Sequence, residues 1–329
     1  MFCNLLNFQV LPYLNAQSQA RHISDMPRSA EWACVRYTGR DFPTNMKSVA
    51  IISKPWKQEL AGILPELLEW FRQRNYTIYM DEETARYTNG DKVVRRQEIG
   101  ALHPEFVLVL GGDGTLLSAA RAVASEGIPI LAVNLGSLGF LTEIPLDELY
   151  IALESVDQGQ CPVELRSVLD CRLVRAGECI SHHFALNDVV VNKSAISRLV
   201  EFDLFIDGNI VFQYKADGVI IATPTGSTAY SLAAGGPVLM PSVDAFVVTP
   251  VCPHSLTHRP LVVTEKSLIE LRIETGEEQA FLSIDGQVGV PVQQGDQVLC
   301  QRAAHKVKLL RVRRTFFDVL RTKLKWGQR

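Results

Sequence analysis

The chain has several absences that narrow the classes of protein to which it can belong. Its 329 residues contain no apolar run that approaches the roughly 20 residues a helix needs to span a bilayer. The formal net charge is only −3, whereas proteins that bind nucleic acids or membrane surfaces usually carry a basic excess. We therefore expect neither a membrane nor a nucleic acid as a partner. Internal repeats and low-complexity tracts are also lacking.

Cysteine pairs with the spacing of a redox or zinc motif are absent as well. The seven cysteines are odd in number and scattered, and none forms a Cys-x-x-Cys sequence. We expect them to be reduced, buried thiols of a cytoplasmic protein rather than disulfides or zinc ligands. They stand at Cys3, Cys34, Cys161, Cys171, Cys179, Cys252 and Cys300.

Residues 1–45 lack the pattern of a secretory signal, because no cationic segment leads into an apolar one. They show no clear helical or strand period either. A buried strand is predicted directly afterwards, at Val49–Ser53. We expect residues 1–45 to be a poorly ordered extension, and the folded part, with a candidate translation start, to begin at Met46.

A glycine-rich segment, Gly111-Gly112-Asp113-Gly114-Thr115, separates the apolar run Phe106–Leu110 from a helical pattern that starts at Leu116. A buried strand followed by glycines and a helix is typical of the first turn of a βαβ unit. Glycines let backbone N–H groups approach a ligand, and a helix N-terminus favours phosphate. Unlike a Walker-type loop, this loop holds no lysine.

The carboxylate of Asp113 is unexpected in such a loop, because it would repel a bound phosphate. Two roles stay open: it can hold a cation, or it can accept a proton from an incoming hydroxyl. Both roles belong to phosphoryl transfer. The motif alone is equally well explained as a strand-to-helix turn with an aspartate near the N-cap.

Residues 46–145 are predicted to form a Rossmann-like α/β domain. Strands that are apolar throughout are buried on both faces, as in a parallel sheet covered by helices. A second loop, Asn134–Phe140, follows the last strand, so the two loops should face one cleft at the same sheet edge. The expected strands are Val49–Ser53, Tyr76–Met80, Phe106–Leu110 and Ile128–Val133, and the expected helices are Lys57–Arg74, a short one at Val93–Leu102, and one from Leu116.

Residues 146–312 begin with a helical stretch at Leu146–Val156 and then change to short strands with turn signals such as Asp207-Gly208 and Asp285-Gly286. This pattern predicts an antiparallel β-sandwich. Residues 313–329 are predicted to be a C-terminal amphipathic helix and tail, closed by Gly327. The expected strands are Val163–Val174, His183–Val191, Leu199–Ile206, Val211–Tyr214, Gly218–Ala222, Leu261–Val263, Leu268–Ile273, Gln279–Ile284, Gln297–Cys300 and Lys306–Val312.

Two polar clusters in the second half are candidate ligand sites. Asn187-Asp188 interrupts an apolar strand, and such a pair can bind the donor and acceptor edges of adenine or a ribose diol. By itself the pair is better explained as a β-turn or bulge. The segment Thr223–Pro237 is uncharged and rich in glycine and hydroxyls, and it carries one aromatic ring, Tyr230. It suits a nucleotide better than an ordinary loop would.

Together these motifs resemble those of the NAD kinase family, over nearly everything from Met46 onward. Gly111–Thr115 resembles the family's first signature, and Asn134–Phe140 resembles its Asn-x-Gly-x-Leu-Gly-Phe loop. Leu186–Asp188 resembles its Asn-acidic motif, although many relatives carry Glu at the last position. Asp217–Pro237 resembles its longest signature. The first signature is shared with diacylglycerol, sphingosine and phosphofructo-kinases, whereas the longest is specific.

The resemblance implies an enzyme of NADP biosynthesis that transfers the γ-phosphoryl group of ATP to the 2′-hydroxyl of the adenosine ribose of NAD. A divalent cation, normally Mg²⁺, would accompany the triphosphate, and no residue of the chain is assigned as a metal ligand. Family members are commonly dimers or tetramers, so we expect a homo-oligomer.

The resemblance also implies roles for individual residues. Asp113 would accept the proton of the hydroxyl, and Asn187 with Asp188 would bind the adenosine half of NAD. A basic residue at Lys215 is typical of members that prefer NAD over NADH. The expected nucleotide-binding residues are Asp113, Gly114, Asn187, Asp188, Arg198, Lys215, Asp217, Thr228, Ala229, Tyr230, Ser231, Leu232, Ala233 and Gln287.

Two rival hypotheses remain at this point. A lipid or sugar kinase of the same superfamily would share the glycine loop, but a lipid kinase would need an apolar or basic membrane patch that the composition does not suggest. A non-catalytic nucleotide-sensing module would keep the cleft, but it would have no need for the base Asp113.

Overall fold

The structure is a computed structural model that describes residues 47–88, 92–193, 199–274, 280–312 and 315–325. The expected extension at residues 1–45, the site residue Arg198 and the helix-closing Gly327 lie outside these ranges. Within them, no helix is both long and apolar enough to cross a membrane.

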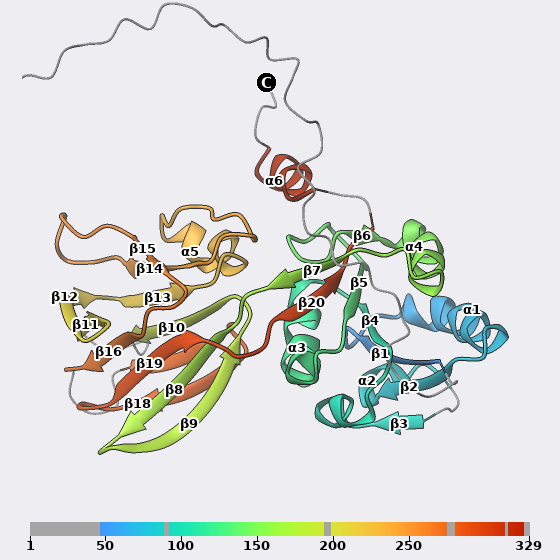
Figure 1. Cartoon of the computed structure of the whole chain (residues 1–329), viewed down its shortest axis with the longest axis horizontal. Coiled ribbons are helices and arrows are strands. Elements are labelled where there is room, and N and C mark those ends of the chain that lie inside the picture. The colour runs from blue at the N-terminus through green and yellow to red at the C-terminus, as the bar shows by residue number, and fades with distance from the viewer. Residues whose placement is uncertain (1–46, 89–91, 194–198, 275–279, 313–314, 326–329) are drawn as a thin grey trace, which may run out of the picture. The chain divides into compact units, whose positions relative to one another are not determined.

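The α/β domain contains an eight-stranded sheet in the order β3-β2-β1-β4-β5-β20-β7, with the short β6 paired to β5 (Figure 1). All neighbours are parallel except β20 and β7. The strands are β1 (Ser48–Ser53), β2 (Thr77–Asp81), β3 (Lys92–Val94), β4 (Phe106–Leu110), β5 (Ile130–Asn134), β6 (Ile144–Pro145), β7 (Val163–Arg166) and β20 (Val307–Leu310).

Helices cover both faces of this sheet, as the uninterrupted apolar strands predicted. Along β4, Leu108 packs in the core beneath α1 and α4, while its neighbours Val107 and Val109 pack against α3. This alternation follows from the period of two in a strand. The helices are α1 (Leu60–Gln73), α2 (Glu82–Ala85), α3 (Asp113–Val123) and α4 (Leu149–Asp157).

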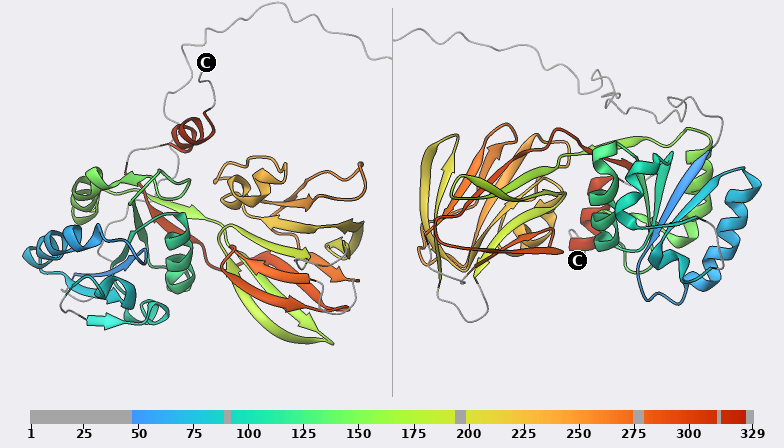
Figure 2. Two further views of the ribbon diagram at one scale, coloured as in Figure 1. Left: turned by 180° about the vertical axis from the view of Figure 1, so that it is seen from behind. Right: turned by 90° about the horizontal axis from the view of Figure 1, so that it is seen from below.

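The second half folds into two antiparallel six-stranded sheets packed face to face, so the predicted α/β domain followed by a β-sandwich is confirmed (Figure 2). One sheet has the order β15 (Leu261–Thr264), β14 (Ala245–Val251), β13 (Gly218–Ala222), β10 (Asp188–Lys193), β17 (Ala280–Ile284) and β18 (Val288–Val292). The other has the order β12 (Asn209–Ala216), β11 (Val200–Ile206), β16 (Ile269–Ile273), β19 (Gln297–Arg302), β8 (Leu169–Arg175) and β9 (Glu178–Ala185).

The boundary between the two halves differs from the one expected at residue 145. Helix α4 packs in the α/β core, and the strands β7 and β20 belong to the α/β sheet rather than to the sandwich. Both strands were expected to be sandwich strands because their alternating pattern does not say which sheet they join. The chain therefore crosses between the domains after β7 and again before β20.

Several local predictions were wrong. The edge strand β18 was not expected, and the strand expected at Val163–Val174 is two strands, β7 and β8, in different sheets. Cys179 and Cys252, which were expected to be buried, are exposed. The short helix expected at Val93–Leu102 is instead the edge strand β3 and two 3₁₀ turns, because the β-branched pair Val93-Val94 extends the sheet beside β2. The central strand β14 was missed, since Pro250 interrupts its strand pattern. The strand expected at His183–Val191 is two strands, β9 and β10, which belong to different sheets.

The two expected turns are confirmed. Asp207 and Gly208 join β11 to β12, and Asp285 and Gly286 join β17 to β18, each with positive φ at both central positions. Such primed turns match the twist of a hairpin and are favoured by Asp-Gly. The C-terminal helix is α6 (Phe316–Leu324), capped by Thr315 and Asp318 in a reciprocal capping box.

Candidate active site

The two glycine-containing loops of the α/β domain line one cavity of about 360 Å³, as their common sheet edge predicted. The first loop follows β4 and contributes Gly111–Gly114, and the second follows β5 and contributes residues from Asn134 to Gly139. Asp113 is the first residue of α3, so the N-terminal end of that helix also faces the cavity.

The carboxylate of Asp113 is held by the second loop. Its Oδ1 accepts hydrogen bonds from the N–H groups of Leu141 (3.2 Å) and Thr142 (2.9 Å) and from the hydroxyl of Thr142 (2.9 Å). Its Oδ2 accepts one, from the N–H of Phe140 (2.9 Å). A carboxylate has about four acceptor positions over its two oxygens, so Oδ1 is fully used and Oδ2 keeps an open position.

Gly139 allows this close contact. A Cβ at residue 139 would lie 1.9 Å from Asp113 Oδ1 and 2.5 Å from Thr142 Oγ1. The conformation that fixes Asp113 is therefore available only with glycine at this position.

The Asn187-Asp188 turn is held by another carboxylate, Asp285. Asp285 accepts hydrogen bonds from the backbone N–H groups of Leu186 (3.2 Å), Asn187 (2.8 Å) and Asp188 (3.2 Å), and its side chain is fully buried. The turn connects β9 to β10, which belong to different sheets of the sandwich. Asn187 Oδ1 is buried and has no hydrogen-bond partner among the described residues.

Burial and the neighbouring charge of Asp285 raise the pKa of Asp188 to about 7. Its carboxyl group is therefore divided between the neutral and ionised forms at neutral pH. In the neutral form it can donate a hydrogen bond as well as accept one.

The hydroxyl-rich segment packs directly on the Asn187 backbone. The N–H of Thr223 donates to Asn187 O (2.9 Å), and a Cβ at Gly226 would lie 2.0 Å from the same oxygen. Inside the segment, the hydroxyls of Thr228 and Ser231 bond to Thr225 O and Thr249 Oγ1. These two hydroxyls stabilise the loop, while Tyr230, in the short helix α5 (Tyr230–Ala233), exposes its ring.

Contacts between the domains join the loop of Asp113 to the Asn187 turn. Gln287 Nε2 donates to Gly114 O at 2.8 Å, and Gln287 Oε1 accepts from Arg121, a residue of α3. Arg121 also pairs with Asp285 (3.4 Å). Asp285, Gln287 and Arg121 therefore connect the helix that carries Asp113 to the Asn187 turn.

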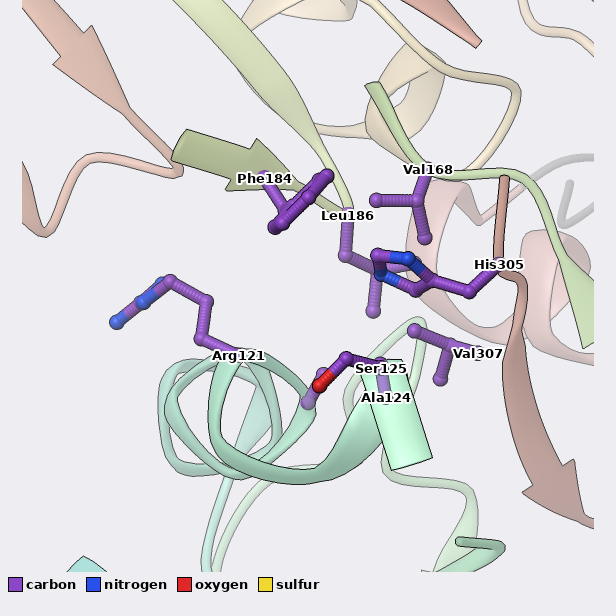
Figure 3. A pocket seen from close by; sticks show the side chains of 9 residues that line it. Arg121, Ala124, Ser125, Val168, Phe184, Leu186, His305 and Val307 are labelled. Atoms are coloured by element: carbon purple, nitrogen blue, oxygen red, sulfur yellow. The ribbon is translucent and has the colours of Figure 1, made fainter. Parts of the chain in front are cut away.

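Behind these contacts lies a small apolar pocket of about 20 Å³, which has room for little more than a water molecule. Figure 3 shows Ala124 and Ser125 on its α3 side and Phe184, Leu186 and His305 opposite them. It belongs to the seam between the domains and is too small for a nucleotide.

A second connection runs through Arg166, the last residue of β7, which is only 2% exposed. Its guanidinium donates to Thr225 Oγ1 of the hydroxyl-rich segment (3.2 Å) and to Glu164 (3.1 Å). Arg311 pairs in turn with Glu164 and with Glu143, the residue after Thr142. Burial and the charge of Arg311 lower the pKa of Arg166 to about 10, so it stays charged at neutral pH.

Lys215 and Asp217, two of the expected site residues, lie far from the Asn187 turn of the same chain. Lys215 pairs with Glu201 and Asp217 pairs with Lys193, each at 2.6 Å. Asp217 precedes β13 and Thr223 follows it, so the six residue steps from one to the other along the strand separate them by about 20 Å. The structure does not bring Lys215 and Asp217 together with Asn187.

Sequence reasoning missed several residues that shape the site: Arg121, Asp285, Arg166, and the cavity-lining lysines Lys54, Lys57 and Lys323. Only Asp285 carried a local signal, as part of an Asp-Gly turn. Across the described ranges, no three His, Cys, Asp or Glu side chains are grouped so that they could hold a metal ion.

Profiles of known families match both domains of the chain. The ATP-NAD kinase N-terminal domain matches residues 49–161, and the ATP-NAD kinase C-terminal domain matches residues 186–312. The chain belongs to the NAD kinase family.

Curated members of the NAD kinase family match this chain over the whole of their own length. The NAD kinase of Koribacter versatilis is 62% identical over 284 residues, which are 86% of this chain and 100% of the relative. The NAD kinase of Acidobacterium capsulatum is 52% identical, with the same shares of the two chains.

Solved structures of the family share the fold. Yeast NADH kinase complexed with NADH is 27% identical with a TM-score of 0.77, over 87% of this chain and 90% of that one. An NAD kinase from Archaeoglobus fulgidus in complex with ATP is 22% identical with a TM-score of 0.66, over 84% and 97%. The second likeness shows the fold alone.

Proposed function

We propose that this chain phosphorylates the 2′-hydroxyl of the adenosine ribose of NAD with ATP as donor, giving NADP, and that Asp113 is its general base. The chain is an NAD kinase, and full-length relatives carry that assignment. The observation that carries the role of Asp113 is the fixed carboxylate in the cavity, with one acceptor position open on Oδ2.

Oδ2 is the oxygen that we assign to the incoming hydroxyl. Phosphoryl transfer needs little covalent chemistry from the protein, so positioning the reactants and balancing charge account for most of the rate. A base within hydrogen-bond reach of the hydroxyl typically contributes about 10²–10⁴-fold. The four hydrogen bonds to Asp113 hold the carboxylate in one orientation, which supports this role.

The adenosine half of NAD is proposed to bind at the Asn187 turn. The unpartnered Oδ1 of Asn187 and the partly protonated Asp188 offer an acceptor and a donor at one place. Tyr230 offers an exposed ring for the base, within the proposed contact segment from Thr228 to Ala233. Gln287, two residues after the Asp285 that holds this turn, donates a hydrogen bond to Gly114 O and so links the turn to the loop of Asp113.

The donor is proposed to enter as the complex of ATP with Mg²⁺. Mg²⁺ usually keeps several waters and binds through substrate phosphates together with one or two carboxylates. The cavity, which Asp113 lines with one carboxylate, fits Mg²⁺ bound in this way. The N–H of Thr115 donates to Gly112 O, but among the described residues the N–H groups of Asp113 and Gly114, at the start of α3, have no acceptor and suit the phosphate oxygens.

Lys215, Asp217 and Arg198 enter the proposal through the family resemblance. Because Lys215 and Asp217 are remote from Asn187 in one chain, they can contact NAD only if a second copy presents them. The proposal therefore includes assembly into a dimer or tetramer, which light scattering measures. It also includes a cytoplasmic location, in keeping with the free thiols of Cys161, Cys171 and Cys300.

One assay tests the proposed function: NADP formation from NAD and ATP with Mg²⁺, with NADH as the alternative acceptor and inorganic polyphosphate as the alternative donor. We expect NADP with ATP as donor and a preference for NAD over NADH. Phosphorylation of a lipid or sugar without NADP formation would contradict the proposal. Nucleotide binding without any turnover would favour the sensing module instead.

A further inference from the structure

The glycine loop holds no lysine of its own, but the fold places one beside it. β1 and β4 are parallel neighbours in which Ser53 lies opposite Leu110, so Lys54 continues beside Gly111 (Figure 1). The N–H of Lys54 donates to Leu110 O at 2.8 Å. A Cβ at Gly111 would lie 3.1 Å from the Lys54 Cβ, so no residue separates the two segments.

Two further lysines line the same cavity. Lys57 comes from the segment after β1 and Lys323 from the C-terminal helix α6. Beside these three lysines, Asp113 is the only carboxylate among the described residues of the lining. Lys57 approaches Glu59 only to 3.7 Å, and within the described ranges Lys54 and Lys323 have no carboxylate partner.

This charge distribution favours an anionic ligand. Three ammonium groups and the N-terminal end of α3 surround a cavity whose one carboxylate is already hydrogen-bonded. Lysine binds phosphate as a mobile point charge, whereas a carboxylate ligand would more often be met by the fork of an arginine. Among the described residues that line the cavity, none is an arginine.

We infer that Lys54, assisted by Lys57 and Lys323, binds the phosphate groups of the donor and so takes the part that the loop lysine plays in a Walker-type site. The inference rests on the proposed function.

In the reaction, the bond between the ribose O2′ and the γ-phosphorus forms while the bond from the γ-phosphorus to the bridging oxygen breaks. The proton of the hydroxyl passes to Asp113 Oδ2. The electron pair of the broken bond stays on the β-phosphate of the leaving ADP, where the ammonium of Lys54 stabilises the added charge.

The experiment compares Lys54→Met, Lys54→Arg and the control Lys266→Met, an exposed lysine outside the cavity. We expect Lys54→Met to lower kcat/KM for ATP by about 10²-fold, the lower end of the cost of removing one preorganised electrostatic contact. We expect KM for NAD to change less than about threefold. Lys54→Arg should keep a higher kcat/KM for ATP than Lys54→Met, because arginine keeps the positive charge. Lys57→Met and Lys323→Met should each lower kcat/KM for ATP less than Lys54→Met does.

Calorimetric titration with ATP and Mg²⁺, and separately with inorganic tripolyphosphate, gives a readout that does not depend on turnover. Both should bind Lys54→Met more weakly than the parent chain. The inference is overturned if Lys54→Met, folded by circular dichroism, keeps the parent kcat/KM for ATP, or if only KM for NAD rises. Should Lys54→Met not fold, the same criteria apply to Lys57→Met and Lys323→Met. Absence of NADP formation by the parent chain would instead refute the proposed function.

Discussion

Gly139→Ala is the substitution whose consequence follows most directly from the geometry of the site. A methyl group at this position would lie 1.9 Å from Asp113 Oδ1 and 2.5 Å from Thr142 Oγ1. Neither distance is possible for a real Cβ. Either the carboxylate leaves its position or the loop from Asn134 to Thr142 moves away, and both remove the hydrogen bonds that fix Asp113.

The size of the effect follows from the role of the base. A displaced general base costs about 10²–10⁴-fold in turnover, or roughly 3–5 kcal/mol in the activation free energy. NAD is proposed to bind through the other domain, at the Asn187 turn. We therefore expect kcat to fall by about 10²–10⁴-fold while KM for NAD stays within about threefold of the parent value.

Steady-state assay of NADP formation, with NAD and ATP varied separately, measures both quantities. Gly136→Ala is the matched control, because it adds the same methyl group to the same loop. The nearest atom to its Cβ would be Asn134 Oδ1 at 3.8 Å, an ordinary contact. A parent-like kcat in Gly139→Ala, or an equal loss in Gly136→Ala, would refute the reasoning.

Two other substitutions test the remaining parts of the site. Arg166→Met leaves the partly exposed Glu164 paired with Arg311 alone and removes the buried contact to Thr225, so we expect a loss of about 1–3 kcal/mol in the free energy of urea unfolding and a higher KM for NAD; parent values for both quantities would contradict this expectation. Asp188 has its pKa raised to about 7, so the folded state holds a proton that the unfolded state has released, and the contribution of Asp188 to stability falls as pH rises from about 4 to 7. Relative to the parent chain, Asp188→Asn should therefore gain stability with rising pH, by up to about 4 kcal/mol above pH 8 in urea unfolding. The exposed control Asp147→Asn should show no such trend, and a pH-independent difference for Asp188→Asn would contradict the assigned pKa.

The parts of the fold that the sequence predicted are those in which local pattern and final environment agree. The three- and four-residue spacing of Leu60, Leu64, Leu67 and Phe71 gives one buried face of α1. The uninterrupted apolar run of β4 is buried on both sides. In the candidate site, the two glycine loops were placed at one sheet edge by the same reasoning.

The parts that could not be predicted depend on contacts between residues far apart in the sequence. β7 and β20 pair with each other across the domain boundary, and nothing in their own residues indicates which sheet they join. Asp285 acts by accepting hydrogen bonds from a turn almost one hundred residues earlier. Lys54 lies beside the glycine loop only because β1 and β4 are neighbours. Such residues carry no local motif.

Asp113→Asn decides whether the carboxylate of Asp113 is the general base. The amide keeps the shape of the side chain but cannot accept the proton of the ribose hydroxyl. The assay is NADP formation from NAD and ATP with Mg²⁺, together with calorimetric titration of NAD. We expect NAD still to bind while turnover falls by about 10²–10⁴-fold, and unchanged turnover would remove Asp113 from the mechanism.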